Sequence, residues 1–366
     1  MRVGLVTPRY RPAIGGVETH VEQLATGLVA AGHDVEVLTQ APDSALPAEE
    51  QHAGVLIRRF RVLTDGEHYR FAPGLLRVLA RCAGGWDVLH AHNYHALPAL
   101  MAALTRRGAF ILTPHYHGMS QSSFRDVLHR PYRIAGALMM RRASRVIAVA
   151  PSEAALIERH FPRAGQKLAI VPNGVDGPEI AAARPFDTGD KRVVLAAGRL
   201  ADYKRVDATI RALEHLDARY VLRVSGDGPM RSRLQALARE LGADDRVTFL
   251  GHVAREELYG WFRTADVFVT MSEIEAMGIT ALEALAGGAR VVASDIPAHR
   301  DVAELGGKRV RLISPAASPA QLAAAIEEAA ANDAPAQSIP TWDEVLERTL
   351  AVYDDAIAQS SGTRVE

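Results

Sequence analysis

The sequence contains a single cysteine, Cys82, among 366 residues. One cysteine excludes an intramolecular disulfide and any zinc site built on cysteine pairs, and it fits a reducing, cytoplasmic environment. Net charge is also nearly absent, because 42 basic side chains stand against 43 acidic ones. Such a chain has no overall field that could hold nucleic acid or an anionic membrane, so any anion site must be local.

Long apolar runs are missing as well. No window approaches the roughly 18 uninterrupted apolar residues of a membrane span, and the run after Met1 is too short for the core of a signal peptide. The composition, 48% hydrophobic and 23% charged, is that of a globular protein. A length of 366 residues is enough for two domains that each bury a core, so we expect a soluble, cytoplasmic, two-domain protein.

Short apolar runs that end at Gly, Pro or His alternate with amphipathic stretches, a pattern typical of parallel βαβ units. The first strand is predicted at Arg2–Thr7 and is followed, after Gly15 and Gly16, by a helix with one apolar face. The other strands of the first half are predicted at Val35–Leu38, Val55–Phe60, Val88–Ala91, Phe110–Thr113, Arg145–Val149 and Lys167–Val171. Those of the second half are predicted at Val193–Ala197, Tyr220–Ser225, Arg246–Leu250, Val267–Thr270, Arg290–Ala293 and Val310–Leu312.

The segment Asp176–Lys191 has turn-forming residues, two prolines and no sustained apolar period, so we place the domain boundary there. The predicted fold class is α/β, with two Rossmann-like, doubly wound domains at 1–178 and 190–335 that face each other across a cleft. Ligands in such sheets bind at the carboxyl ends of the strands. After the prolines of 335–340, an amphipathic helix is predicted at 342–358, and its pattern fits packing on either domain.

Gly15 and Gly16 stand between the first strand and its helix. Glycine lets a phosphate approach the backbone, and the unpaired amides of a helix N-terminus favour an anion. A tight turn without a ligand explains the same residues. The spacing G-x-G-x-x-G is absent, which argues against a dinucleotide oxidoreductase.

In the second half, Arg199 and Lys204 follow a predicted strand just before a helix. A guanidinium can bind phosphate oxygens in two places and an ammonium acts as a point charge, so the pair suits a diphosphate. A solvated loop is the alternative interpretation.

The densest pattern runs from Ser272 to Gly288 and begins where a predicted strand ends. Gly278 marks the expected start of a helix, whose first amides, around Ala276–Ile279, would form an anion site. Glu275 precedes that start, and Glu283 lies about 7–8 Å further along the helix axis. The two carboxylates suit hydroxyls on either side of a bound diphosphate, although two merely exposed glutamates give the same pattern.

Two histidine pairs end neighbouring predicted strands, His90 with His92 and His115 with His117. Neutral histidines can donate to phosphates or hydroxyls, or bind a metal ion. A metal-dependent hydrolase is therefore an alternative function. The sequence shows no obvious carboxylate ligands nearby, so we predict no metal site.

Taken together these residues resemble a retaining glycosyltransferase of family 4 with the GT-B fold, and the resemblance covers nearly the whole chain. Its markers are Gly15-Gly16-Val17-Glu18, Thr113-Pro114-His115, Pro172 to Asp176, Gly198-Arg199 with Lys204, Ser225 to Pro229, and Glu275-x(7)-Glu283.

The resemblance implies a nucleotide-diphosphate sugar, UDP- or GDP-linked, as donor and no cofactor. It implies that Arg199 and Lys204 hold the diphosphate, that Glu283 binds the ribose, and that backbone at His252 and Val253 reads the base. Donor-sugar contacts would come from Glu275 and from Ala276, Met277, Gly278 and Ile279. Gly16 would close on the phosphates and His115 would lie near the sugar. The helix 342–358 would pack back on the first domain.

One departure concerns Ala276 and Met277, which stand where relatives have Gly-Phe, and this leaves the donor sugar open. The predicted strand ends carry no Asp-x-Asp motif, so the resemblance implies a metal-independent reaction. The acceptor is open among small molecules, glycans and lipid-linked alcohols, as is the oligomeric state. No nucleic acid is expected as a partner.

The stretch Phe124–Arg142 mixes arginines with apolar residues. It fits either a peripheral contact with the inner face of a membrane or a packed helix with a solvated face. We favour the packed helix because Pro131 interrupts the period. Remaining alternatives are a nucleotide-sugar epimerase or phosphorylase of the same fold, and a non-catalytic sugar-binding module.

Overall fold

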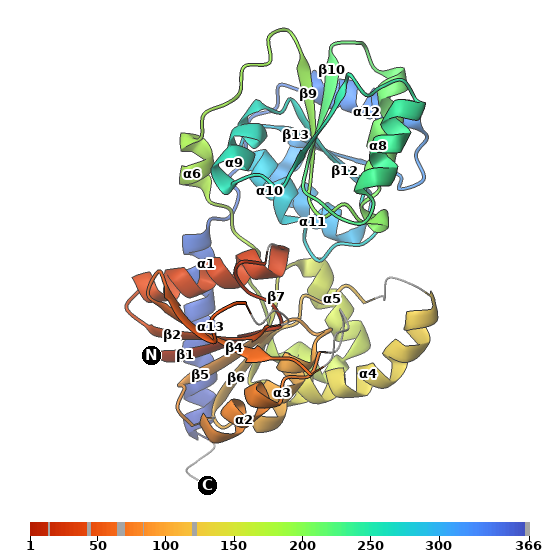
Figure 1. Cartoon of the computed structure of the whole chain (residues 1–366). Coiled ribbons are helices and arrows are strands. Elements are labelled where there is room, and N and C mark those ends of the chain that lie inside the picture. Colours follow the sequence, from red (N-terminus) through yellow and green to blue (C-terminus); the bar gives the residue numbers. More distant parts are fainter. Residues whose placement is uncertain (14, 42–44, 64–69, 83, 119–122, 363–366) are drawn as a thin grey trace. The chain divides into compact units, whose positions relative to one another are not determined.

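The computed structural model describes residues 1–13, 15–41, 45–63, 70–82, 84–118 and 123–362, without the side chains of 123–131 and 361–362. The chain divides into two compact units (Figure 1). Unit 1 comprises Met1–Asn173 and Trp342–Glu366, and unit 2 comprises Gly174–Thr341. Each unit is a parallel sheet with helices on both faces.

The sheet of unit 1 has the strand order β3-β4-β2-β1-β5-β6-β7-β8, and only the edge strand β3 is antiparallel to its neighbour. Its strands are β1 Arg2–Thr7, β2 Asp34–Ala41, β3 Glu49–His52, β4 Val55–Arg61, β5 Val88–His92, β6 Ala109–Thr113, β7 Arg145–Ala148 and β8 Leu168–Ile170. Strands β1, β5, β6 and β7 are almost entirely buried because helices cover both faces.

One face of this sheet is covered by α2 Pro73–Cys82, α3 Leu97–Thr105, α4 Ser123–Arg142 and α5 Pro151–His160, around a core that includes Tyr94, Phe110 and Tyr116. The other face is covered by α1 Gly16–Ala30 and the C-terminal helix α13 Trp342–Gly362. Helix α13 packs against α1 and β6, and its Tyr353 is fully buried. The last helix therefore completes unit 1, as the resemblance implied.

The sheet of unit 2 is wholly parallel, in the order β11-β10-β9-β12-β13-β14. Its strands are β9 Arg192–Ala197, β10 Tyr220–Ser225, β11 Val247–Gly251, β12 Val267–Thr270, β13 Arg290–Ser294 and β14 Val310–Ile313. Its helices are α6 Gly177–Ala182, α7 Val206–Ala212, α8 Arg231–Glu240, α9 Arg255–Thr264, α10 Ile279–Ala286, α11 Pro297–Gly306 and α12 Pro319–Ala330.

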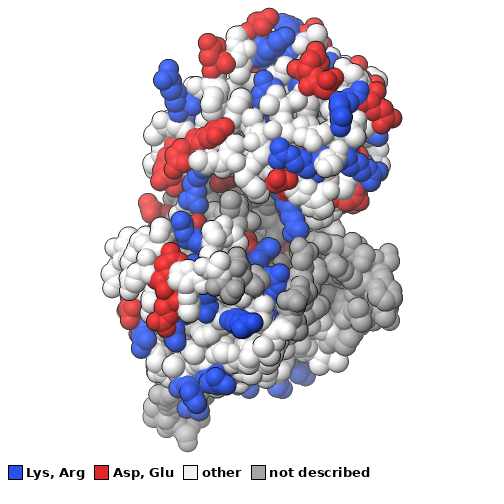
Figure 2. All heavy atoms as spheres, viewed as in Figure 1, with Lys and Arg blue, Asp and Glu red and all other residues white. Residues whose placement is uncertain are grey.

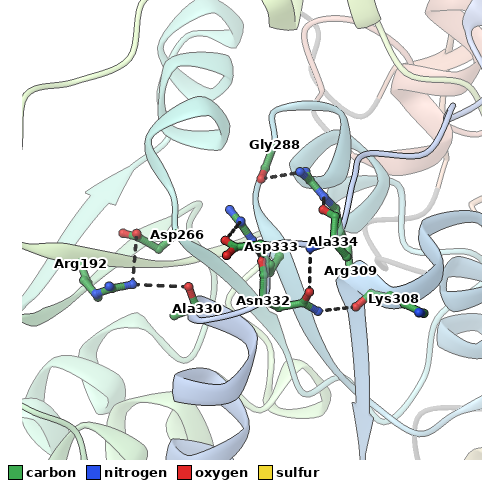
Figure 3. Close-up of polar contacts among 10 residues, drawn as sticks. Arg192, Asp266, Gly288, Lys308, Arg309, Ala330, Asn332, Asp333 and Ala334 are labelled. Atoms are coloured by element: carbon green, nitrogen blue, oxygen red, sulfur yellow. Dashed lines mark hydrogen bonds and ion pairs between the residues drawn. The ribbon is translucent and has the colours of Figure 1, made fainter.

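Polar contacts secure the edge of the unit 2 sheet where its strands begin (Figure 3). Arg309 donates to the carbonyl of Ala334 at 2.8 Å and to that of Gly288 at 3.1 Å, and Asn332 donates to the carbonyl of Lys308 at 2.6 Å. These bonds join the segments that follow α10, α11 and α12. The polar side chains drawn at this edge thus bind protein groups.

The predicted strand ranges agree with the structure to within a residue or two, except that β2 runs three residues further, to Ala41. β3 was not predicted. Asp176–Lys191, expected to be a linker, contains α6, whose N-terminus is capped by the Asp176 carboxylate accepting from the Glu179 amide at 3.4 Å. α6 packs on α9 and α10, so this segment belongs to unit 2, which begins at Gly174. Pro131 was expected to interrupt its helix, but α4 runs through it. A proline inside a helix removes one backbone hydrogen bond and can kink the helix without ending it.

On the face shown in Figure 2, basic and acidic side chains are interspersed over the described surface of each unit. This matches the net charge of −1. Among the described residues we find no helix with both the length and the apolarity that crossing a membrane requires.

Candidate active site

The strand order of unit 2 reverses between β9 and β12, which are neighbours in the sheet although two other strands lie between them in sequence. In doubly wound sheets this switch point is where ligands bind, beyond the carboxyl ends of the strands. The segment with Arg199 and Lys204 follows β9, and the segment with Glu275 follows β12. The fold therefore brings the two predicted anion-binding segments to the same point.

The backbone after β9 is held by close contact with the loop after β10. The amides of Gly198 and Leu200 bond to the carbonyls of Ser225 and Asp227 at 3.0 and 2.9 Å. A Cβ on Gly226, whose φ is 114°, would overlap the Gly198 carbonyl oxygen, and one on Gly228 would overlap that of Leu200. Both positions thus require glycine, which explains the Ser225–Pro229 marker.

Lys204 and Glu275 meet directly. The Lys204 Nζ donates to Glu275 Oε1, and their side chains are only 21% and 16% exposed. Beside them, Arg205 Nη1 lies 3.0 Å from Glu273 Oε1. The Glu273 amide also donates to the Tyr203 carbonyl at 2.8 Å. Two ion pairs and a backbone bond therefore hold the β9 and β12 segments together.

A small pocket opens between these segments. It is lined by residues after β9 and at the end of β12, among them Gly198, Arg199, Lys204, Thr270 and Ser272. Arg199 is exposed, whereas Lys204 is partly buried. The pocket thus has one exposed and one partly buried cation on its wall, and both side chains are types that bind phosphate oxygens.

Helix α10 begins beside the pocket. Gly278 caps it in the left-handed conformation, with φ 83° and ψ 57°, and the first amides of such a helix have no partner within it. Ala276 and Ile279 are half-buried, while Met277 is only 2% exposed. The Met277 side chain is thus enclosed by protein, unlike its two neighbours.

The two glutamates have opposite electrostatic settings. Burial alone would raise the pKa of Glu275, but the charge and hydrogen bond of Lys204 outweigh it and leave that pKa below its ordinary value. Burial raises the pKa of Glu283 to about 7, with Arg255 opposing the shift and Asp176 adding to it. The contact with Lys204 therefore favours the anion of Glu275, whereas burial favours the protonated form of Glu283.

A buried polar chain under the α10 start was not predicted from the sequence. The Ser294 hydroxyl donates to the Ser272 carbonyl at 2.5 Å, and the Nδ1 of His299 donates to the Ser294 carbonyl at 2.8 Å. His299 is fully buried, and its Nε2 would lie 3.9 Å from a Cβ on Gly278. This chain ties β12, β13 and α11 together beneath the Glu275 segment, which it helps to position.

His252 and Val253 follow β11, two strands away from β9 in the sheet. His252 is exposed and Val253 half-buried. Nearby, Arg231 pairs with Asp227 at 3.2 Å. The structure thus places the predicted base-reading segment on the far side of the β9–β10 loops from Glu275.

In unit 1 the equivalent switch point lies between β1 and β5. His92 ends β5, His115 follows β6 with a left-handed φ of 47°, and His20 lies on α1. The ring centroid of His20 lies 5.4 Å from that of His92 and 5.2 Å from that of His115. His20 was not singled out from the sequence, because only the fold brings α1 to β5 and β6.

The other predicted histidines have different surroundings. His90 Nδ1 is 2.8 Å from the Tyr353 hydroxyl and its Nε2 is 2.8 Å from the Thr113 hydroxyl. His117 stacks on His95 at 4.5 Å between ring centroids. The two sequence pairs therefore do not form one four-histidine site.

At the start of α1, Gly16 is exposed and Gly15 has extended backbone. Glu18 lies against them, since a Cβ on Gly15 would overlap its carboxylate, and Arg9 pairs with Glu18 at 2.8 Å. In this structure the helix N-terminus thus faces the protein's own carboxylate.

Solved structures define the class of this fold. The chain resembles sucrose-phosphate synthase from Thermosynechococcus elongatus with a TM-score of 0.76 and 22% identity, over 99% of this chain and 98% of that one. It resembles Anabaena HepE, solved in complex with UDP and glucose, with a TM-score of 0.73 and 21% identity, over 99% and 95% of the two chains. Two such parallel-sheet units make up the GT-B fold of glycosyltransferases.

Sequence comparison identifies the family. The model of glycosyltransferase family 4 matches residues 14–177, and that of glycosyl transferases group 1 matches residues 180–340. A D-inositol 3-phosphate glycosyltransferase from Streptomyces scabiei is 30% identical over 338 residues, which are 79% of this chain and 74% of the relative. The chain belongs to glycosyltransferase family 4 and is an enzyme that transfers a sugar from a nucleotide sugar.

Proposed function

We propose that this enzyme transfers a hexose from a UDP- or GDP-linked donor to an acceptor hydroxyl, with retention of configuration and without a metal ion. One observation carries the proposal. Arg199, Lys204, Glu275 and the start of α10 converge at the switch point of the unit 2 sheet. This combination offers cations and helix amides for a diphosphate beside a carboxylate for a sugar.

Cleavage of the sugar–phosphate bond leaves negative charge on the departing diphosphate. Arg199, Lys204 and the amides of Gly278 and Ile279 would stabilise that charge, the task that a metal ion performs in other enzymes. Lys204 is paired with Glu275 before the donor binds. When Lys204 turns to the diphosphate, the Glu275 carboxylate becomes free to accept hydrogen bonds from sugar hydroxyls.

The remaining contacts follow the resemblance. Glu283 would accept from the ribose hydroxyls, and the backbone of His252 and Val253 would read the base. From unit 1, Gly16 would approach the phosphates and His115 would donate to the sugar or to the leaving oxygen. The acceptor oxygen forms its bond to the anomeric carbon on the face that the diphosphate leaves, and the acceptor proton passes to the departing phosphate oxygen.

The acceptor is narrowed by relatives only in part. The Streptomyces relative is named a D-inositol 3-phosphate glycosyltransferase, and HepE was solved with UDP and glucose. An acceptor panel should thus contain inositol phosphates beside sugars and lipid-linked alcohols, and a donor panel should contain UDP- and GDP-hexoses.

A binding and turnover assay tests the proposal. Purified protein is screened by thermal shift against UDP- and GDP-sugars, because a true donor at saturating concentration raises stability by mass action. The best donor is then incubated, radiolabelled, with the acceptor panel, with and without chelator, and the anomeric configuration of the product is read by NMR. Absence of binding to every donor contradicts the proposal, and loss of turnover with chelator contradicts metal independence.

The alternative functions are separated in the same assay. Product formation without an acceptor favours an epimerase, and dependence on inorganic phosphate favours a phosphorylase. A metal-dependent hydrolase requires a metal ion for turnover and releases free sugar.

We further propose a cytoplasmic enzyme in which α4 is a packed helix. Met139 and Met140 of α4 are buried, and Tyr132 donates to the Tyr94 carbonyl at 2.9 Å, whereas Ile134 is 75% exposed. The arginines of the first half of α4 lie outside the described side chains. Co-sedimentation with anionic vesicles tests this: a packed helix predicts no binding, and binding that salt abolishes would show a peripheral membrane contact.

A further inference from the structure

Three histidines meet at the switch point of unit 1. His20, His92 and His115 each offer a ring nitrogen, and these nitrogens lie within 4.8 Å of one another. The three side chains come from α1 and from the ends of β5 and β6. They are 3%, 0% and 7% exposed, so the cluster is enclosed by protein.

The nitrogens of this cluster lack ordinary partners. Within the described part of the chain, neither ring nitrogen of His92 nor the Nε2 of His115 has a hydrogen-bond partner. The Nδ1 of His20 lies 2.7 Å from Asn173 Oδ1, an oxygen that can only accept, so Nδ1 carries the proton and Nε2 keeps a lone pair. Buried polar atoms in native proteins nearly always have a partner, so these nitrogens indicate a ligand.

The cluster is also in the protonation state that a metal requires. Burial lowers the pKa of His20 to about 4 and places those of His92 and His115 well below the ordinary value. Neutral imidazoles present lone pairs, whereas protonated ones repel a cation.

We propose that His20, His92 and His115 bind a divalent transition-metal ion, for which Zn²⁺ is the natural choice. Three imidazoles without a carboxylate suit zinc rather than magnesium or calcium, which prefer oxygen ligands. Zinc–nitrogen bonds of 2.0–2.1 Å place tetrahedral ligand atoms about 3.3 Å apart, so the rings must approach one another on binding. A fourth position is left for water.

Neighbouring groups support this assignment. The Asn173 oxygen on His20 Nδ1 orients that ring, as outer partners of metal-binding histidines do. His90 lies 4.1 Å from His92 between ring centroids, but Tyr353 and Thr113 occupy both of its nitrogens. His90 therefore supports the site and does not ligate.

The metal is regulatory here and takes no part in sugar transfer. This second step rests on the proposed function, in which the donor uses His115. Because zinc would occupy the Nε2 of His115, bound zinc should compete with the donor and inhibit transfer. Metal binding itself does not depend on the protein being a transferase.

Metal binding is measured first, on the untagged full chain after treatment with chelator. Titration with Zn²⁺ by calorimetry, and with Co²⁺ by its visible absorption, should show one ion per chain. His20→Ala and His92→Ala should each weaken binding by about a hundredfold or more, and Asn173→Ala by about tenfold to a hundredfold. His215→Ala, an exposed histidine of unit 2, is the matched control and should bind as the wild type does.

Circular dichroism of each variant without metal shows whether it is folded. If a histidine variant fails to fold, the proposal is judged from the zinc stoichiometry of the wild type and from the zinc affinity of the Asn173→Ala variant. Failure of the wild type to bind one ion, or unchanged binding in the folded variants, overturns the proposal and leaves buried water as the partner of these nitrogens.

Activity then tests the regulatory step. Zinc at one equivalent should inhibit transfer by the wild type, chelator should restore it, and His20→Ala should resist inhibition. One bound zinc without any transferase activity would refute the proposed function and keep the metal site. Full transfer with no bound zinc would refute the metal site and keep the proposed function.

Discussion

The two sheets of this enzyme place different chemistry at equivalent points. At the unit 2 switch point the side chains are charged and partly exposed, with Lys204 paired to Glu275. At the unit 1 switch point they are neutral, buried imidazoles. The residues that follow the strands thus decide the chemistry, and they are the reason why we propose an anion site in unit 2 and a cation site in unit 1.

The difference also concerns how each site is held together. The unit 2 segments are joined by ion pairs, and in the proposed function the donor diphosphate replaces Glu275 as the partner of Lys204. In unit 1, His90 bonds to Tyr353 and Thr113, and His20 bonds to Asn173. Neutral hydrogen bonds thus hold these two rings of unit 1, whereas ion pairs join the segments of unit 2.

The largest expected effect comes from removing the charge of unit 2. Lys204→Ala should lower turnover about tenfold to a hundredfold, because a charge-assisted contact contributes about 1.5–3 kcal/mol and each 1.4 kcal/mol is tenfold in rate. It also leaves Glu275 half-buried without its cation. Turnover of the identified donor measures the effect. Lys191→Ala, exposed and away from the pocket, is the control; equal activity of both variants would show that Lys204 has no role.

A second prediction concerns His115, one of the neutral histidines of unit 1. His115→Ala should reduce transfer about tenfold while changing donor affinity less, since this histidine is proposed to act at the sugar and leaving oxygen. His115→Asn keeps a residue that tolerates the left-handed conformation and so separates the ring from backbone strain. Steady-state kinetics and calorimetry with the donor measure both quantities. A greater loss of affinity than of turnover would make His115 a donor-anchoring residue instead.

A third prediction uses the shifted pKa of Glu283. The free carboxyl has a pKa of about 7, with Arg255 and Tyr259 of α9, Asp176 and Glu179 around it. Ribose hydroxyls donate to the ionised form, so donor binding lowers that pKa and expels a proton below pH 7. Affinity for the UDP- or GDP-sugar should therefore be about tenfold weaker at pH 6 than at pH 8. Calorimetry at both pH values measures this, and Glu283→Gln should remove the dependence.

The parts of this structure that the sequence predicts are those set by local pattern. Buried apolar runs ending at Gly, Pro or His gave nearly every strand, and the positions of Arg199 and Glu275 followed from the strand ends. Strand β3 could not be predicted, because Glu49–His52 has no apolar period and forms a strand only by pairing with β4.

Contacts between distant segments could not be predicted in the same way. His20 joins His92 and His115 only because the sheet order places β1 beside β5 and β5 beside β6. The pairing of Lys204 with Glu275 likewise needs β9 beside β12, a neighbour relation that spacing does not reveal. The burial of Met277 depends on packing around the start of α10. All three depend on tertiary contacts, and these contacts determine which of the predicted residues lie in the same site.

The smallest expected effect concerns the hydrogen bond between Tyr353 and His90 in unit 1. Tyr353→Phe removes the hydroxyl bonded to His90 Nδ1 and leaves that buried nitrogen without a partner, at a cost of about 1–2 kcal/mol. Urea unfolding followed by tryptophan fluorescence measures the loss, since Trp86 and Trp342 belong to unit 1. Tyr203→Phe, at a half-buried position of unit 2, should change stability less. If Tyr353→Phe leaves stability unchanged, the bond between Tyr353 of α13 and His90 does not contribute to holding the histidines of unit 1 in place.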